Sequence, residues 1–203
     1  MGVRDLDKKI AYDAMDEKIA ILAEEGIILV SGEIGDGSAS VFFITTSFLQ
    51  ITRPNKPIWI VMNSTGGSVT ECLAICDIIR ALIKMGIPVN ILGVGLIASG
   101  ATLIMQMATR RYSFPHTQFL IHQASQSIIE EKEEVSQGEE RIEEMKRVNK
   151  LVMGLISKRI GMPLDKLIKL AKKTDYWLDA EAAKKLGSNG LIDEIVDRYP
   201  FEL

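Results

Sequence analysis

A serine stands in the middle of the most apolar stretch of the chain, ILGVGLIASGATLIMQMA, which covers residues 91–108. Ser99 lies where a predicted strand gives way to a predicted helix. Its side-chain oxygen could simply cap that helix by accepting a backbone N–H. It could instead be a nucleophile, because the unpaired N–H of Gly100 at the helix start would stabilise an oxyanion beside it. Both interpretations stay open, and Ile97 breaks the Gly-x-Ser-x-Gly spacing of α/β-hydrolases.

A pair of glycines forms a second candidate element in NSTGGSV, residues 63–69. The preceding apolar strand is predicted to end at Asn63 and to turn through Gly66 and Gly67 into a helix. Glycines allow a positive φ and a close approach of the backbone to a ligand. The strand ends of a parallel sheet meet at one edge. We therefore expect the Gly67 N–H beside Ser99, as a second oxyanion donor.

A serine needs a nearby base and an orienting acid to become a nucleophile near neutral pH. Of the two histidines, His122 in FLIHQ ends an apolar strand that can reach the same edge, whereas His116 follows Pro115 in a predicted turn. Asp175 in KTDYWL is the preferred acid. Asp179 is the reserve, although it is better placed to cap the helix AEAAKKLG.

The surrounding sequence predicts one α/β domain over residues 1–203, with a mostly parallel sheet. Apolar runs of strand length alternate with amphipathic helices, which is typical of right-handed βαβ units. The strands are expected at 26–34, 57–63 and 89–95 and in RYSF, QFLIHQ and GLIDEIV, and the helices in SASVFFITTSFLQIT, 69–86, GATLIMQMA and PLDKLIKLAKK. Residues 130–160 are rich in charge and predict one long helix with i,i+4 ion pairs that leaves the compact body.

Composition narrows the function classes. A net charge of −3 gives no basic surface for nucleic acid. Cys72 and Cys76, the only cysteines, lie four residues apart in an apolar helical pattern and predict core packing in a reducing compartment. The charged N-terminal residues 1–20 are not a signal peptide, and the glycines, Thr102 and Gln106 argue against a membrane span in residues 91–108. We expect a cytoplasmic protein that binds neither membranes nor nucleic acid.

The ordered set NSTGGSV, GLIASGA, FLIHQ and TDYWL…GLIDEIV resembles the proteolytic subunit of Clp protease, the caseinolytic serine protease family. The resemblance runs from about Gly26 to Val196. It implies the ClpP/crotonase-like α/β fold. It also implies Ser99 as nucleophile, His122 as base and Asp175 as orienting acid.

The same resemblance implies an oxyanion hole made by Gly67 and Gly100 and a handle helix from roughly Glu133 to Ile160. Subunits of this family form two stacked heptameric rings, a tetradecamer, around a closed chamber. An AAA+ unfoldase that uses ATP feeds unfolded polypeptides into the chamber. The subunit itself is expected to need no cofactor and no metal.

Several positions depart from the family pattern. Thr65, Gly100, Ala124 and Thr174 replace the usual proline, methionine, proline and arginine, and SIIEEKEEVS replaces an expected glycine-rich strand. These changes indicate a divergent or phage-like relative. A non-catalytic ring subunit and a crotonase-like acyl-CoA enzyme, which needs no serine, remain as alternatives. A serine–lysine peptidase of the signal-peptide-peptidase type is disfavoured by the lack of a membrane anchor.

Overall fold

The computed structural model describes residues 18–123, 135–172 and 175–202. Most of the N-terminal segment 1–20 therefore lies outside the described residues. So do Ala124, most of SIIEEKEEVS and Thr174, at which the sequence departs from the family pattern. Where the structure is described, it is an α/β fold with a mostly parallel sheet, as the sequence predicts.

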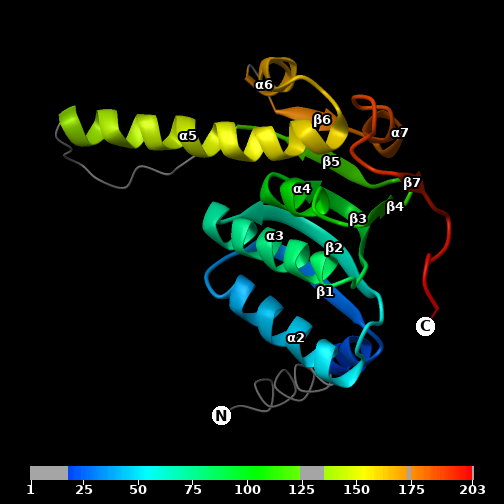
Figure 1. Cartoon of the computed structure of the whole chain (residues 1–203). Helices are drawn as coiled ribbons and strands as arrows, with labels where there is room; N and C mark the ends of the chain where they lie inside the picture. The colour runs from blue at the N-terminus through cyan, green and yellow to red at the C-terminus, as the bar shows by residue number, and fades with distance from the viewer. Residues whose placement is uncertain (1–17, 124–134, 173–174, 203) are drawn as a thin grey trace, which may run out of the picture.

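Three long parallel strands form one side of the sheet, with β1 at its edge: β1 (Ile27–Ile34), β2 (Ile58–Gly67) and β3 (Val89–Ala98). The crossovers are helices α2 (Ser38–Thr52) and α3 (Val69–Lys84). Alternate residues of β2 are fully buried because their side chains share one face of the strand. The helices lie side by side against this face of the sheet (Figure 1).

Strand β2 is longer than predicted. It continues through the glycine pair instead of ending at Asn63, because Gly66 and Gly67 still pair with Glu33 and Ile34 of β1. A shift of register after Gly32 makes this extension possible. The expected turn through the glycines is therefore wrong, and helix α3 begins directly after the strand.

Strand β3 pairs with two different strands along its length. Its first half pairs with β4 (Arg110–Ser113) and its second half with β5 (Gln118–Ile121). An irregularity in its pairing with β2 separates the halves: Gly95 adopts φ 68°, and Asn63 Oδ1 accepts the N–H of Leu96 at 3.1 Å. This irregularity redirects the end of β3 toward β5, and thus toward the segment that carries the predicted base.

The C-terminal residues supply the strands β6 and β7, which lie at the opposite side of the sheet from β1. Strand β6 (Tyr176–Leu178) runs antiparallel to β5, and the two-residue strand β7 (Glu194–Ile195) pairs with β4. Helix α4 (Gly100–Met105) follows β3 directly. Helices α6 (Leu164–Lys172) and α7 (Ala180–Lys184) flank β6 in the sequence.

Helix α5 (Val135–Ile160) is the predicted long helix, and it extends well beyond the sheet (Figure 1). Its C-terminal half enters the core, where Met153, Ile156 and Ile160 are at most 2% exposed. Its outer half carries the exposed ion pairs Lys146–Glu143 and Arg147–Glu144, both at spacing i,i+3. Such exposed pairs stabilise a helix only slightly.

Two composition-based predictions can be checked here. Cys72 and Cys76 are free thiols, at most 2% exposed, within the hydrophobic core, so the prediction of core packing is confirmed. Among the described residues no helix is long and apolar enough to cross a membrane.

Candidate active site

Ser99 occupies a strained turn between β3 and α4. Its backbone has φ 55° and ψ −122°, a conformation that L-residues rarely adopt and that costs free energy. Its side chain makes no capping hydrogen bond, so the interpretation of Ser99 as a simple helix cap is wrong. The Ser99 N–H donates to Leu120 O at 3.0 Å, which fixes the turn against β5. The strain thus presents the hydroxyl without using it for local structure.

The two glycine-containing junctions are neighbours, as predicted. A Cβ atom on Gly66 would lie 2.8 Å from the Ser99 Cβ and 2.6 Å from the Gly100 nitrogen. A Cβ atom on Gly67 would lie 2.2 Å from the carbonyl oxygen of Ile34. Side chains are therefore excluded here, and only glycines let β2 pass this close to the Ser99 turn.

The predicted oxyanion donors lie close together. A Cβ atom built on Gly100 would be 3.6 Å from the Gly67 nitrogen. As the first residue of α4, Gly100 has an N–H without a partner inside the helix. Two backbone N–H groups beside a serine hydroxyl are the usual means of stabilising the oxyanion of acyl transfer.

His122 directly follows the last residue of β5 and lies beside the Ser99 turn. Together with Ser99 and Gly67 it lines both a small cavity of about 30 Å³ and a more open groove of about 380 Å³. Its side chain is 29% exposed. The structure shows no hydrogen bond between the described side chains of Ser99 and His122. The base and the nucleophile thus share two cavities but are not joined in this arrangement.

The predicted acid lies near the imidazole of His122. Asp175 Oδ1 is 3.9 Å from His122 Nδ1, and this carboxylate is 56% exposed. Asp179, the reserve acid, instead caps α7 by accepting the Ala182 N–H at 2.8 Å, as its place in the sequence predicts. His116 is exposed in a turn and lines neither cavity.

A buried polar network supports the site, and sequence reasoning missed its role. Thr102, the third residue of α4, donates its hydroxyl hydrogen to Leu120 O at 3.0 Å, and this oxygen also accepts the Ser99 N–H. Gln106 donates to Thr102 O at 3.2 Å and accepts from Arg111 Nη1 at 2.7 Å. The signal in the sequence is the presence of these two polar residues, Thr102 and Gln106, in an apolar stretch.

Arg111 connects this network to the C-terminal segment. The side chain is 2% exposed and forms an ion pair with Asp193, whose carboxylate also accepts the Arg111 backbone N–H at 2.8 Å. Burial raises the pKa of Asp193, but the hydrogen bonds and positive charge of Arg111 outweigh it. The pKa of this carboxyl therefore lies below its ordinary value. The pair holds the turn before β7 against β4.

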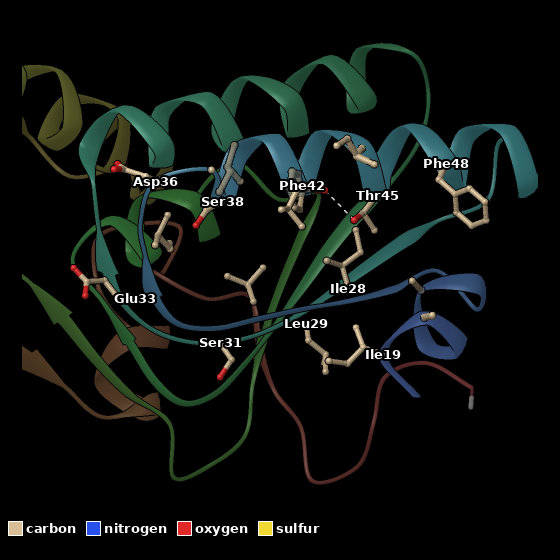
Figure 2. A pocket seen from close by; sticks show the side chains of 18 of the residues that line it. Ile19, Ile28, Leu29, Ser31, Glu33, Asp36, Ser38, Phe42, Thr45 and Phe48 are labelled. Carbon is tan, nitrogen blue, oxygen red and sulfur yellow. Dashed lines mark hydrogen bonds between the residues drawn. The ribbon is translucent and has the colours of Figure 1, made fainter. Parts of the chain in front are cut away.

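A larger cavity lies elsewhere. A groove of about 770 Å³ runs between α2, β1 and the helical residues 18–24, and Figure 2 shows Phe42, Thr45, Phe48, Ile28 and Leu29 around it. No histidine lines this groove. Because size alone does not supply a nucleophile and a base, the smaller cavities at Ser99 are the better candidate for chemistry.

Comparisons with known proteins found related sequences. A sequence model of the family described as Clp protease matches residues 10–199. The chain is 32% identical over 177 residues to the ATP-dependent Clp protease proteolytic subunit 1 of Chlamydia felis (strain Fe/C-56). That alignment covers 86% of this chain and 82% of the relative.

Proposed function

Because this chain belongs to the Clp protease family, we propose that Ser99, His122 and Asp175 are the catalytic residues with which it works as a serine-type endopeptidase. The observation that carries the assignment is the strained backbone of Ser99, whose hydroxyl has no structural use and which shares two cavities with His122. Strain of this kind is typical of functional sites.

In the proposed reaction His122 takes the proton of the Ser99 hydroxyl as its oxygen attacks the peptide carbonyl. The N–H groups of Gly67 and Gly100 stabilise the oxyanion. The C–N bond then breaks, and the proton passes from His122 to the leaving amine. Water hydrolyses the acyl-enzyme by the same route, while Asp175 stabilises the imidazolium.

The substrates in this proposal are unfolded polypeptides, and the subunit works inside an oligomer. The relative is named as a proteolytic subunit of an ATP-dependent protease, which supports an AAA+ unfoldase as the ATP-using partner. The apolar outer face of α2 supports self-association: Val41, Phe43, Ile44 and Ile51 are 57–81% exposed. We propose two stacked heptameric rings in the cytoplasm, with no cofactor or metal in the subunit.

One observation favours a second candidate, a non-catalytic ring subunit. Neither the Ser99–His122 nor the His122–Asp175 pair forms a hydrogen bond in this arrangement, and an unaligned triad would not activate the serine. A crotonase-like acyl-CoA enzyme is less well supported, because such chemistry gives the strained Ser99 no role.

Labelling with a fluorophosphonate separates these candidates. The purified full-length protein should form an adduct on Ser99, located by mass spectrometry, and Ser99→Ala and His122→Ala should both abolish it. Hydrolysis of short peptides should be lost in the same two variants. A stable oligomer that forms no adduct would instead favour the non-catalytic subunit, and an acyl-CoA activity that survives both substitutions would favour the crotonase-like alternative.

A further inference from the structure

Strand β2 changes its register with both of its neighbours at one residue, Ser64. The pairing of Ser64 with Gly32 is the last one before a register shift between β2 and β1. Its pairing with Ile97 is the first one after a register shift between β2 and β3. Ser64 is therefore the residue from which β2 leaves its regular course, just before the glycine pair that reaches the Ser99 turn.

The Ser64 hydroxyl bridges the irregularity between β1 and β2. It donates its hydrogen to Gly32 O, and its oxygen accepts the Gly66 N–H at 3.1 Å. Ser64 is 1% exposed, and low local polarity strengthens hydrogen bonds of this kind. If the hydroxyl were removed, the buried Gly66 N–H would lose this partner, and an unpaired buried N–H costs free energy. The hydroxyl thus fixes the place where the glycine pair begins.

The direction of the Gly67 N–H depends on anchors outside the glycines. Gly66 and Gly67 have φ 80° and 150°, and glycine adopts many other conformations about as readily. The pair is held on both sides, because the Gly66 N–H donates to Ser64 Oγ and the Ser68 N–H donates to Ile34 O at 2.8 Å. The peptide group that carries the Gly67 N–H lies between these two anchors. Loss of the first anchor would therefore free this N–H to turn.

The two glycines lie directly against the Ser99 turn. A Cβ atom on Gly66 would be 2.8 Å from the Ser99 Cβ and 2.6 Å from the nitrogen of Gly100, the other proposed oxyanion donor. A small displacement of the glycine pair therefore changes where the Gly67 N–H points relative to Ser99. Ser64 itself lines neither cavity at Ser99, so it can act on the site only through the glycines.

Building on the proposed function, we infer that Ser64 is a positioning residue for the oxyanion hole. Its hydroxyl holds the Gly66 N–H, and this contact directs the Gly67 N–H at the oxyanion that forms when Ser99 attacks a carbonyl. Ser64 touches neither the substrate nor the reacting atoms in this assignment. Its contribution is the direction of one backbone donor.

The first test is the kinetics of Ser64→Ala with a short fluorogenic peptide amide. The oxyanion is absent from the bound substrate and develops in the transition state, so weaker stabilisation lowers kcat and leaves KM near the wild-type value. Loss of a whole oxyanion donor lowers kcat by about 10²- to 10³-fold. A donor that is displaced but still present should lower kcat by about 10- to 100-fold. Ser64→Cys keeps a side chain of similar size but offers only a weak hydrogen-bonding group, so it should show the same loss if Ser64→Ala folds poorly.

The second test separates positioning from a structural role. In a peptide trifluoromethyl ketone, Ser99 Oγ bonds to the ketone carbon, the hydroxyl proton passes to His122, and the former ketone oxygen becomes an oxyanion. The inhibition constant of this ketone should rise in both Ser64 variants by the same factor of about 10- to 100-fold by which kcat falls. The inhibition constant of the matched peptide alcohol, which forms no oxyanion, should stay at the wild-type value. A substitution that only reduces the folded fraction lowers kcat without changing either inhibition constant.

Ser157→Ala is the matched control. Ser157 is 7% exposed, it donates its hydroxyl hydrogen to Met162 O at 2.6 Å, and it lines neither cavity at Ser99. The variant therefore removes a buried hydroxyl that also bonds to a backbone carbonyl, but one that does not hold the oxyanion hole. Its kcat and both inhibition constants should stay at the wild-type values.

Fluorophosphonate labelling of the wild-type protein separates this inference from the proposed function. If the wild-type Ser99 is labelled and both Ser64 variants keep the wild-type inhibition constant for the ketone, the positioning role is overturned while the serine peptidase stands. If neither Ser64 variant folds while Ser157→Ala does, Ser64 serves the fold and not the site, and the assignment is again overturned. If the wild-type protein is neither labelled nor active on the peptide, the proposed function fails and the role of Ser64 fails with it.

Discussion

His122 Nδ1 lies 3.9 Å from Oδ1 of Asp175, the predicted acid. This distance is too long for a hydrogen bond, but it is short enough for attraction between the carboxylate and a protonated imidazole. More than half of the Asp175 side chain is exposed, so water weakens that attraction. In this arrangement the acid therefore supports the base electrostatically without fixing its tautomer.

Replacing Asp175 by asparagine tests this relationship. In a triad with a hydrogen-bonded acid the same change lowers kcat about 10⁴-fold. Because the carboxylate is neither hydrogen-bonded to His122 nor buried, we expect kcat for peptide hydrolysis to fall only about 10- to 100-fold, with the same loss in the rate of fluorophosphonate labelling.

Asp179→Ala provides the matched control, since it removes a carboxylate four residues away. It should cost about 1 kcal/mol in the free energy of unfolding, because it removes the cap of α7, and it should leave kcat at the wild-type value. A 10⁴-fold loss in Asp175→Asn would show that this carboxylate closes onto His122 in the working form. If Asp179→Ala lowered kcat more than Asp175→Asn did, Asp179 and not Asp175 would be the orienting acid.

Gly66→Ala should disable the site by a steric route. Gly66 has φ 80°, and its new methyl group would lie 2.6 Å from the Gly100 nitrogen and from the Ala98 oxygen. The Ser99 turn must then move, so we expect labelling to slow at least about 100-fold, in line with the loss of an oxyanion donor. The free energy of unfolding, measured in urea, should fall by about 2–3 kcal/mol.

Gly86→Ala isolates the conformational part of that effect. Gly86 has φ 86°, but no atom lies within 4 Å of the position of its new methyl group. A cost of about 1–2 kcal/mol with unchanged labelling is expected from the positive φ alone. Equal losses of labelling in the two variants would contradict a specific contact between the β2 glycines and the Ser99 turn.

Much of the fold could be read from the sequence because its elements have strong local signals. Continuous apolar runs marked β1, β2 and β3, and the alternation with helices predicted their parallel order. The meeting of Gly67 and Ser99 followed from that order, because parallel strands end at one edge. The capping role of Asp179 followed from its place directly before a helix.

Features that depend on tertiary distance could not be read in this way. Nothing local shows that β2 continues through its glycines, since the extension depends on a register shift in β1. The separation of His122 from Asp175 depends on how β6 pairs with β5. The ion-pair partner of Arg111, Asp193, lies 82 residues further along the chain, and an arginine at a strand start usually faces solvent.

The outer face of α2 predicts self-association. Ile44 and Ile51 are 66% and 81% exposed, and apolar side chains exposed together on one helix usually mark an interface. Ile44→Asp combined with Ile51→Asp should shift the protein from an oligomer to a monomer in sedimentation velocity at micromolar concentration. Met85→Asp places a charge on another exposed apolar residue, 66% exposed at the end of α3, and should leave the oligomer intact. A wild-type protein that is already monomeric would contradict the ring assembly.

The Arg111–Asp193 pair should make stability depend on pH in a definite direction. The pKa of Asp193 is lowered in the folded protein, so its stabilising effect is complete above the unfolded value, about 4, and is lost as the pH falls through the lower folded value. Asp193→Asn should cost about 3 kcal/mol near pH 7, because it leaves the buried Arg111 charge uncompensated.

This difference between wild type and Asp193→Asn should shrink as the pH is lowered from about 5 to below 4, in urea titrations at one protein concentration. Glu194→Gln is the neighbouring control: Glu194 pairs with Arg110 at 3.2 Å, but both side chains are about half exposed, so the change should cost at most about 1 kcal/mol at any pH. A constant difference between wild type and Asp193→Asn across this range would mean that the carboxyl has the same pKa in the folded and unfolded chains. The cost of the substitution would then come from lost hydrogen bonds and not from the charge.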